Sequence, residues 1–375
     1  MSERVRVLVV DDSALMRKMI PQILSRDPQI EVIGTAMDGA FGLKKIAELR
    51  PHVVTLDLNM PRMDGVEMLR AITGKHHVPV IIVTSQTEES ARSALKALSL
   101  GAFDFVAKPV DAASGRIEAI AEELAMKIKV AASTGAPKMI LTVTTERKKG
   151  ARAVLERRFP SRVVALGVST GGPAALQYLF SQLPEDFPGC LLVVQHMPEN
   201  FTNMFAKRLD ESCAIEVKEA RSGDLLLAGR ALICPGNRHM KVKHMPHGDV
   251  VVLDEMPPVN GHRPSVDVLF RSMAREFGKS ALAVIMTGMG EDGVAGLGEI
   301  QAAGGITLAQ TSDSCVVDSM PRSAVERGFA DKVISLSALA GVILAHCANE
   351  KLPAELSSAG QSSGLAEADR FSRRR

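Results

Sequence analysis

The sequence predicts an α/β protein of two consecutive units, each a mostly parallel sheet with helices on both faces. Short β-branched runs alternate with helix-like stretches along most of the chain, and strands separated by helices imply crossover connections. The runs are apolar throughout, as in strands buried on both faces. A length of 375 residues also exceeds one ordinary core and suits two domains with a linker.

The first unit, residues 4–125, is expected to be a (βα)5 domain. Each of its expected strands is followed by a helix-like stretch, and five such units in succession make a doubly wound sheet. The expected strands are residues 5–10, 31–36, 53–56, 80–83 and 103–107.

A linker is expected over residues 126–160, because this stretch contains Ser-Thr-Gly-Ala-Pro and two basic clusters. A second doubly wound unit is expected over residues 161–352, and the Ser/Ala/Gly-rich tail, 353–375, is predicted to be disordered. The expected strands of the second unit are residues 163–168, 190–195, 231–234, 250–253, 281–287 and 305–309.

Composition excludes several classes of protein. A net charge of +2, 3% aromatic residues and no Trp argue against a nucleic-acid partner. The five cysteines never form C-x-x-C, which favours reduced thiols over disulfides or zinc. The first residues lack a long apolar signal region, and the apolar stretch 333–348 is too short to span a bilayer. We therefore expect a cytoplasmic protein without membrane insertion.

Acidic side chains follow the first and third expected strands. Asp11 and Asp12 come after the first strand, Asp57 ends the third, and Lys108 ends the fifth. The carboxyl ends of neighbouring strands share one crevice, so these side chains should meet there. Clustered carboxylates are suited to binding Mg²⁺. The ammonium group of Lys108 would neutralise the charge of a phosphoryl group, and the Thr84 hydroxyl would bind a phosphoryl oxygen. Helix capping would explain Asp11 and Asp12 alone, and an ordinary turn would explain Lys108-Pro109, but four strand ends together favour a site.

This first unit resembles a response-regulator receiver domain. The resemblance implies Asp57 as phosphoacceptor, Asp11 and Asp12 as partners of Asp57 at Mg²⁺, and Thr84 with Phe105 as a switch pair. It also implies a histidine kinase as phosphodonor. The matching stretches are Val-Val-Asp11-Asp12-Ser, Leu-Asp57-Leu-Asn-Met-Pro-Arg-Met-Asp-Gly, Thr84-Ser and Phe105-Val-Ala-Lys108-Pro109.

In the second unit the motif Gly-Val-Ser169-Thr-Gly follows an apolar strand and opens a helix-like stretch. Such a turn holds a serine hydroxyl out of the sheet. A serine alcohol needs an adjacent base, and that base needs an orienting carboxylate. His196 ends the next strand and Asp292 follows the strand near residue 285, so one crevice can gather all three. The pattern predicts acyl transfer at an ester or amide.

Two alternative interpretations of these motifs compete with catalysis. A serine in a Gly-rich turn is also typical of phosphate-binding loops. The stretch Gly-Met-Gly-Glu-Asp292-Gly spells the G-x-G-x-x-G of dinucleotide-binding proteins, with Asp313 about twenty residues further on. Glu291 and Asp292 would place negative charge where a pyrophosphate must approach, which argues against that interpretation. The chain order Ser, His, Asp also excludes the α/β-hydrolase fold.

Residues 161–352 resemble the catalytic domain of the chemotaxis protein-glutamate methylesterases, the CheB family. The matching stretches, in the family's order, are Gly-Val-Ser169-Thr170-Gly-Gly-Pro, Gln-His196-Met-Pro, Pro235-Gly-Asn-Arg-His239-Met, Asn260-Gly-His262-Arg-Pro-Ser-Val-Asp267-Val-Leu-Phe, Thr-Gly-Met289-Gly-Glu-Asp292-Gly and Ser314-Cys-Val-Val-Asp-Ser-Met-Pro321.

This second resemblance implies Ser169 as nucleophile, His196 as general base and then acid, and Asp292 as its orienter. Backbone N–H groups near Thr170 and Met289 would meet the oxyanion. The implied substrates are glutamyl methyl esters, and selected glutamines, on cytoplasmic helices of chemoreceptors. The side chains of the further motif residues have either a substrate-binding or a structural role; they are His239, His262 and Arg263.

The presence of both sites in one chain suggests that the receiver covers the esterase crevice until Asp57 is phosphorylated. Two other classes of protein also contain receivers: modules that only bind receptors, and DNA-binding regulators. The complete set of Ser169, His196 and Asp292 argues against the first. The second requires a helix-turn-helix and a basic output domain, and neither is apparent in the sequence.

Overall fold

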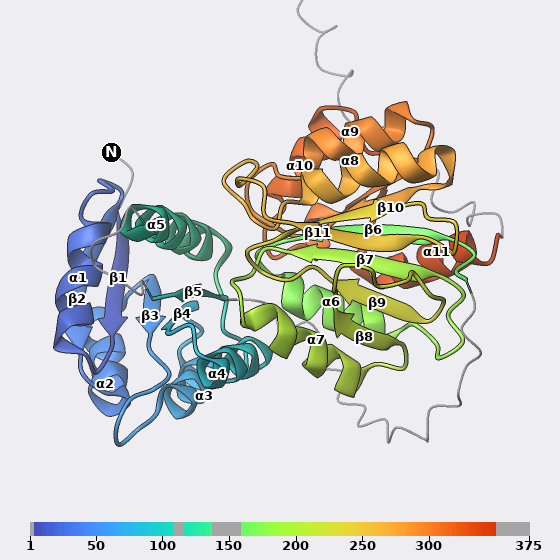
Figure 1. Cartoon of the computed structure of the whole chain (residues 1–375). Coiled ribbons are helices and arrows are strands. Elements are labelled where there is room, and N and C mark those ends of the chain that lie inside the picture. Colours follow the sequence, from blue (N-terminus) through green and yellow to red (C-terminus); the bar gives the residue numbers. More distant parts are fainter. Residues whose placement is uncertain (1–3, 109–115, 137–158, 350–375) are drawn as a thin grey trace, which may run out of the picture.

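The computed structural model describes residues 4–108, 116–136 and 159–349 (Figure 1). Most of the expected linker and the whole expected tail, residues 353–375, lie outside these ranges. Within them, no helix combines the length and the apolar character that a membrane span requires.

The first unit is a five-stranded sheet of order β2-β1-β3-β4-β5, in which every neighbouring pair is parallel. The strand order reverses at β1, so the loops after β1 and β3 border one crevice at the carboxyl edge of the sheet. In chain order the elements are β1 (Val5–Val10), α1 (Ala14–Leu24), β2 (Ile30–Ala36), α2 (Gly39–Leu49), β3 (Val53–Leu56), α3 (Gly65–Lys75), β4 (Val80–Thr84), α4 (Glu88–Ser99), β5 (Asp104–Ala107) and α5 (Arg116–Thr134).

Alternation along β1 explains why helices cover both faces of this sheet. Val7 and Val9 belong to an apolar cluster with side chains of α1 and α5, whereas Leu8 and Val10 join a cluster with side chains of α2 and α3. All four are at most 1% exposed. Each such side chain contributes about 1.5–3 kcal/mol by leaving water, which fixes the sheet between two helical layers.

The second unit has a seven-stranded sheet of order β14-β13-β12-β6-β7-β9-β8, again parallel throughout, and a separate antiparallel pair, β10-β11. In chain order the elements are β6 (Val163–Val168), α6 (Gly172–Ser181), β7 (Cys190–Gln195), α7 (Phe201–Ser212), β8 (Glu216–Glu219), β9 (Arg230–Ile233), β10 (His239–Lys243), β11 (Val250–Asp254), α8 (Val266–Phe277), β12 (Leu282–Ile285), α9 (Val294–Ala302), β13 (Ile306–Gln310), α10 (Ser319–Glu326), β14 (Lys332–Ile334) and α11 (Leu336–Cys347).

Helices cover both faces of the second sheet as well. Val164 and Leu166 of β6 share an apolar cluster with side chains of α6, α7 and α11, whereas Val163 and Ala165 share one with α8, α9 and α10. Figure 1 shows α8, α9 and α10 above the sheet and α6 and α7 below it. The predicted doubly wound α/β class is confirmed for both units.

The sequence analysis did not predict three of the described strands, β8, β10 and β14. They are short or lie at an edge of a sheet. β8 and β14 end the sheet on opposite sides, and β10 pairs only with β11. The charged sequence of β8, Glu-Val-Lys-Glu, resembles a solvated helix or loop. The helix α5 also continues to Thr134, past the expected domain boundary at residue 125, because Ile128 and Ala131 are buried.

The two units contact each other through the β5 side of the first sheet (Figure 1). The Phe105 ring of β5 stacks on the Phe201 ring of α7, with ring centroids 4.7 Å apart and an interplanar angle of 8°. Nearby, the Asn200 side-chain amide donates a hydrogen bond to the Gln86 carbonyl at 3.2 Å. One apolar cluster accordingly runs from Ala94 and Leu95 of α4 into α6 and α7.

Candidate active site and phosphorylation site

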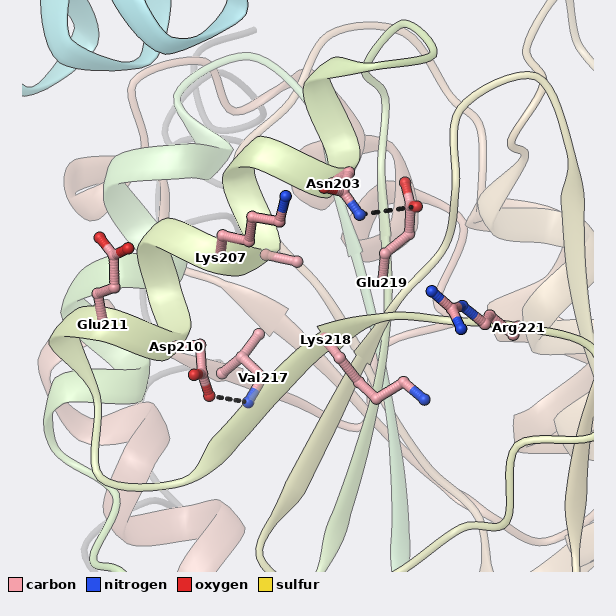
Figure 2. Close-up of a pocket in the computed structure, with 9 residues that line it drawn as sticks. Asn203, Lys207, Asp210, Glu211, Val217, Lys218, Glu219 and Arg221 are labelled. Atoms are coloured by element: carbon pink, nitrogen blue, oxygen red, sulfur yellow. Dashed lines mark hydrogen bonds between the residues drawn. The ribbon is translucent and has the colours of Figure 1, made fainter. Parts of the chain in front are cut away.

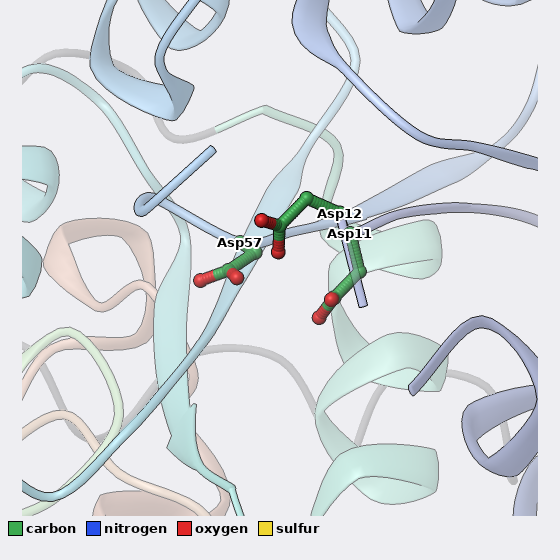
Figure 3. A group of neighbouring side chains, drawn as sticks. All are labelled: Asp11, Asp12 and Asp57. Carbon is green, nitrogen blue, oxygen red and sulfur yellow. The ribbon is translucent and has the colours of Figure 1, made fainter. Parts of the chain in front are cut away.

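Three carboxylates meet at the carboxyl edge of the first sheet. One ligand oxygen from each of Asp11, Asp12 and Asp57 lies within 4.8 Å of the others (Figure 3). Asp11 and Asp57 are buried, and Asp12 is exposed. Like charges at this spacing repel one another, whereas a hard divalent cation with oxygen ligands would join them. The donor set therefore fits Mg²⁺, with Asp12 open to solvent to admit bound water.

Lys108 makes direct ion pairs with two of these acids. Its Nζ lies 2.8 Å from Asp11 Oδ2 and 2.7 Å from Asp57 Oδ2. Burial disfavours the charged lysine, but its hydrogen bonds to both carboxylates prevail and raise the pKa of Lys108. Burial also raises the pKa of Asp11, although Lys108 opposes this effect. The site thus holds a fixed positive charge beside Asp57.

The two residues of the expected switch pair have different surroundings. Thr84 is completely buried, and its hydroxyl finds no hydrogen-bond partner among the described residues. Phe105 contacts the second unit through Phe201. Lys127 of α5 also contacts Phe105: its Nζ donates to the Phe105 carbonyl at 2.7 Å and lies 5.6 Å from the ring centroid. Phe105 therefore links the first unit to the second.

In the second unit, the turn between β6 and α6 fixes the backbone of Ser169. The Ser169 N–H donates to the Thr287 carbonyl at 3.0 Å, and the Gln195 amide donates to the Ser169 carbonyl at 2.9 Å. Gly171 has φ +79°, a left-handed conformation that disfavours other residues. The Ser169 hydroxyl makes no hydrogen bond within the described ranges, so it remains available to a substrate.

His196 and Asp292 form the central pair of the site. His196 Nε2 lies 2.8 Å from Asp292 Oδ2, and the imidazole is 9% exposed. The other ring nitrogen, Nδ1, is buried without a hydrogen-bond partner among the residues described. Because Nε2 is committed to the carboxylate, Nδ1 is the nitrogen that can accept a proton.

Asp292 is buried, and its carboxylate caps the N-terminus of α8 although it lies in a loop 26 residues further along the chain. It accepts the N–H of Val266, the first residue of α8, at 2.7 Å, and the Ser265 hydroxyl at 2.7 Å. Burial opposes its charge, but hydrogen bonds from His196, Ser265 and Val266 prevail and lower the pKa of Asp292. A carboxylate at a helix N-terminus is also favoured by the helix dipole. Asp292 therefore stays ionised and keeps the His196 ring oriented.

The loop that follows β12 packs against the Ser169 turn. The Thr287 hydroxyl donates to the Thr170 carbonyl at 2.9 Å, and Thr170 itself is buried. A Cβ on Gly288 would lie 2.8 Å from Ser169 Cβ, so only glycine permits this approach. Met289, next in the chain, is half-buried. Thr170 and Met289 thus belong to two loops that meet at Ser169.

Two of the three further motif residues have structural contacts. Buried His239 accepts the Ser265 N–H at 3.2 Å through Nδ1, and its Nε2 lies 3.1 Å from the Pro257 carbonyl. The Arg263 guanidinium donates to Asn237 Oδ1, with distances of 2.6 and 3.0 Å. His262 differs from both, because its ring stacks directly on His196.

The first unit approaches the loops of this site. Met289 and Val317 belong to the apolar cluster that includes Leu124 and Ile128 of α5. The charges of Glu123 and other α5 side chains also act on His262. The Ser169 site and the receiver-like unit therefore share a boundary.

A separate pocket of about 350 Å³ lies between α7 and β8 (Figure 2). Several of its polar groups are already paired: Glu219 accepts from Asn203 at 3.3 Å, and Asp210 accepts the Val217 N–H at 2.9 Å. Its lining includes none of the site residues predicted from sequence. The lining also mixes acidic and basic side chains, so its chemistry does not select a ligand.

Sequence reasoning missed the residues that support the pair of His196 and Asp292. Ser265 precedes an apolar helical stretch and has the pattern of an ordinary N-cap, but its hydroxyl donates to Asp292 instead. Gln195 joins the Ser169 turn to its own strand. Neither role has a local sequence signal, because each partner lies 26 or 27 residues away along the chain.

Comparison with known proteins agrees with the fold of both units. Residues 7–120 match the response regulator receiver domain family, and residues 164–343 match the CheB methylesterase family. A protein-glutamate methylesterase/protein-glutamine glutaminase 2 of Koribacter versatilis is 60% identical over 93% of this chain and 98% of its own length. A protein-glutamate methylesterase/protein-glutamine glutaminase of Symbiobacterium thermophilum is 45% identical over 92% of this chain and 98% of its own.

Among solved structures, the catalytic domain of Thermotoga maritima CheB methylesterase is 37% identical to this chain. It covers 49% of this chain and 97% of its own length, with a TM-score of 0.48.

The fold and the two sites define a response regulator whose receiver precedes an α/β output domain of the methylesterase type. More particularly, the chain belongs to the CheB family of protein-glutamate methylesterase/protein-glutamine glutaminases.

Proposed function

We propose that this chain is a phosphorylation-activated protein-glutamate methylesterase. It hydrolyses glutamyl methyl esters on the cytoplasmic helices of chemoreceptors, and it deamidates selected glutamines there. The names of its relatives support the substrate class, and the receiver supports control by phosphorylation. The observation that carries the hydrolytic assignment is the hydrogen-bonded pair of partly buried His196 and buried Asp292 beside the Ser169 turn.

In the proposed mechanism, His196 Nδ1 takes the proton of the Ser169 hydroxyl as Oγ attacks the glutamyl carbonyl carbon. The tetrahedral intermediate collapses, the proton passes from Nδ1 to the methoxy oxygen, and methanol leaves the acyl-enzyme. Water then attacks with the same proton relay and releases glutamate and free Ser169. Asp292 keeps the proton on Nε2 throughout and stabilises the imidazolium that forms.

Backbone N–H groups of Thr170 and Met289 are proposed to bind the oxyanion. Flanking N–H groups are occupied: Ser169 donates to the Thr287 carbonyl and Gly288 donates to the Val317 carbonyl. In the described chain, the N–H groups of Thr170 and Met289 have no such acceptor. Each donor of this kind contributes about 10²–10³ to the rate.

The receiver is proposed to accept a phosphoryl group on Asp57 from a histidine kinase. Asp11, Asp12 and Asp57 would hold Mg²⁺, which would neutralise phosphoryl charge when bound. Lys108 would pair with a phosphoryl oxygen, and the unpartnered Thr84 hydroxyl would donate to another.

Phosphorylation is proposed to loosen the receiver from the esterase crevice. The phosphoryl group adds a charge of about −1.5 to −2 and draws Thr84 and its neighbours toward Asp57. Movement of Phe105 would then break its stack on Phe201. We assign residues 4–125 to the receiver, 126–160 to a linker, 161–352 to the catalytic domain and 353–375 to a tail. The cytoplasm is the proposed location, because the implied kinase and receptor helices are there.

The test is methanol release from a methyl-labelled receptor fragment, with and without Mg²⁺ and a small phosphodonor. The rate is expected to rise with the phosphodonor and to be abolished by Ser169→Ala. Asp57→Ala should retain the basal rate of methanol release, and the phosphodonor should no longer increase it. A rate that ignores the phosphodonor would remove the regulatory proposal, and full hydrolysis by Ser169→Ala would overturn the assigned nucleophile.

A further inference from the structure

The hydrogen bond to Asp292 does not fix the His196 ring by itself. A single bond at Nε2 leaves the imidazole free to rotate about an axis through Nε2, and such a rotation would change the direction in which Nδ1 points. The His262 ring lies face to face with His196, with centroids 3.9 Å apart and an interplanar angle of 7°. A parallel aromatic neighbour at this distance blocks the rotation on that side.

The loop that presents His262 is held tightly on both sides. The His262 N–H and carbonyl pair with the Val259 carbonyl and N–H at 2.9 and 3.0 Å. The Asn260 amide donates to Asp267 at 2.8 Å and to Asp292 at 3.2 Å. The same loop therefore touches the acid that orients His196 and the ring that stacks on it, so His262 keeps its place relative to both.

His262 is also neutral near pH 7. Burial, with the nearby His196, lowers the pKa of His262 to about 4. The other charged groups that act on it are Asp292 and, from α5, Glu123 and Lys127. An uncharged ring can stack on His196 in both of its protonation states, and its π-face attracts the imidazolium that forms during hydrolysis.

We propose that His262 is a positioning residue of the hydrolytic site, which fixes the plane of the His196 ring so that Nδ1 faces Ser169. The proposal rests on the proposed function, and it assigns His262 no proton transfer and no substrate contact. A flat apolar ring should therefore replace it. His262→Phe keeps a stacking surface, whereas His262→Ala removes it.

The full chain provides the test, with Mg²⁺ and phosphodonor present. The first readout is the rate at which a fluorophosphonate probe labels Ser169, which needs an aligned base and no receptor substrate. His262→Ala should label about tenfold more slowly than the wild type, since stacking of this kind changes the aligned population by about that factor. His262→Phe should stay within about threefold of the wild type. His346→Ala is the matched control, a partly buried histidine of α11, and it should label normally.

The second readout is the low-field proton resonance of the His196 Nε2–H in its bond to Asp292, which needs no turnover. It should be sharp in the wild type and in His262→Phe, and broadened in His262→Ala. Wild-type labelling together with a sharp resonance in His262→Ala would overturn the proposal, as would His262→Phe behaving like His262→Ala. A different result separates this proposal from the proposed function. If the wild type released no methanol from the receptor fragment, while the probe still labelled His262→Ala slowly and His262→Phe normally, the proposed substrate would be wrong and the positioning role of His262 would stand.

Discussion

Asp292 combines a structural role at the start of α8 with its proposed role in the chemistry. The residue is 1% exposed, and a buried charge of this kind is costly unless donors surround it. The donors come from His196, from the Asn260 amide, from the Ser265 hydroxyl and from the first N–H groups of α8. The ionised form is therefore the stable one, and His196 is oriented as a consequence.

Ser265→Ala should weaken this arrangement. The substitution removes a hydroxyl donor 2.7 Å from Asp292 Oδ1, so the free energy of unfolding should fall by about 1.5–3 kcal/mol. The kcat for methanol release should also fall, by roughly tenfold, because His196 is less firmly oriented. Urea unfolding and steady-state kinetics measure the two effects.

Ser272→Ala is the matched control for this prediction. Ser272 is a buried serine on α8, the helix that Ser265 precedes, and its hydroxyl accepts the Val242 N–H at 3.1 Å, away from Asp292. The Ser272→Ala variant should have a lower free energy of unfolding than the wild type, whereas its kcat should stay at the wild-type value. Equal losses of kcat in both variants would show that Ser265 acts only through overall stability.

His262 should make stability depend on pH. The pKa of His262 is lowered to about 4 in the folded chain, against about 6.5 in the unfolded chain, so the unfolded state binds more protons between these values. Stability contributed by the neutral ring is complete above pH 6.5 and is lost as the pH falls toward 4. The loss should be roughly 1–3 kcal/mol, the lower value allowing for partial exposure.

Urea unfolding at pH 7 and pH 4.5 tests this linkage. His262→Phe cannot titrate, so its loss of stability on acidification should be smaller than that of the wild type. The titrating groups that do not act on His262 are common to both proteins and cancel in the comparison. The same loss in both proteins would contradict the linkage.

At the scale of elements, the close contact between the loop after β12 and the turn after β6 should tolerate no added side chain. A Cβ at Gly288 would lie 2.2 Å from Met320 Sδ and 2.8 Å from Ser169 Cβ. Gly288→Ala should therefore displace Ser169 and lower kcat by about a hundredfold, with about 1–3 kcal/mol lost from the free energy of unfolding. Methanol release and urea unfolding provide the measurements.

Gly341→Ala is the control for Gly288→Ala in the same domain. A Cβ at Gly341, within α11, would meet no atom within 4 Å. Alanine there should leave kcat unchanged and raise stability by up to about 1 kcal/mol, because it favours the helix. If both variants lost activity alike, the close approach of Gly288 to Ser169 would not explain the loss.

The buried parallel strands were predictable because their apolar runs are continuous and end at turn residues. The expected strands 53–56, 163–168 and 190–195 coincide with β3, β6 and β7. β8 and β10 carry charged residues and pair at edges, where the sequence is not constrained to be apolar. Their position depends on neighbours distant in the chain, and this information is absent from any local window.

The site was predictable where residues follow strand ends, and unpredictable where support comes across loops. Asp11, Asp57 and Ser169 are placed by strand order alone. The stack of His262 on His196 and the bond from Ser265 to Asp292 join segments that no motif relates. Such contacts follow from the folded backbone, and single-residue patterns do not encode them.

At the scale of the whole molecule, the boundary between the receiver and the catalytic domain should set the basal activity. Asn200→Gly removes the hydrogen bond to the Gln86 carbonyl and tolerates the φ of +72° at this position. Methanol release without phosphodonor should rise about two- to tenfold, because one hydrogen bond is worth about 0.5–1.5 kcal/mol. The rise produced by phosphodonor should shrink by the same factor.

Asn349→Gly provides the matched control for this boundary. Asn349 also has a positive φ, +58°, and lies beyond the end of α11. It should leave basal and stimulated rates unchanged. An unchanged basal rate in Asn200→Gly would show that this contact does not hold the receiver in place.

The capping of α8 by Asp292 also bears on how this enzyme could lose its activity during evolution. With Ser169 as the proposed nucleophile, a descendant that stopped hydrolysing esters would no longer need it, because its hydroxyl has no structural partner among the described residues. It would still need Asp292 to close the helix. Relatives that have lost esterase activity are therefore expected to have replaced Ser169 first and to have kept Asp292. The residue at position 169 would then distinguish active from inactive members of the family.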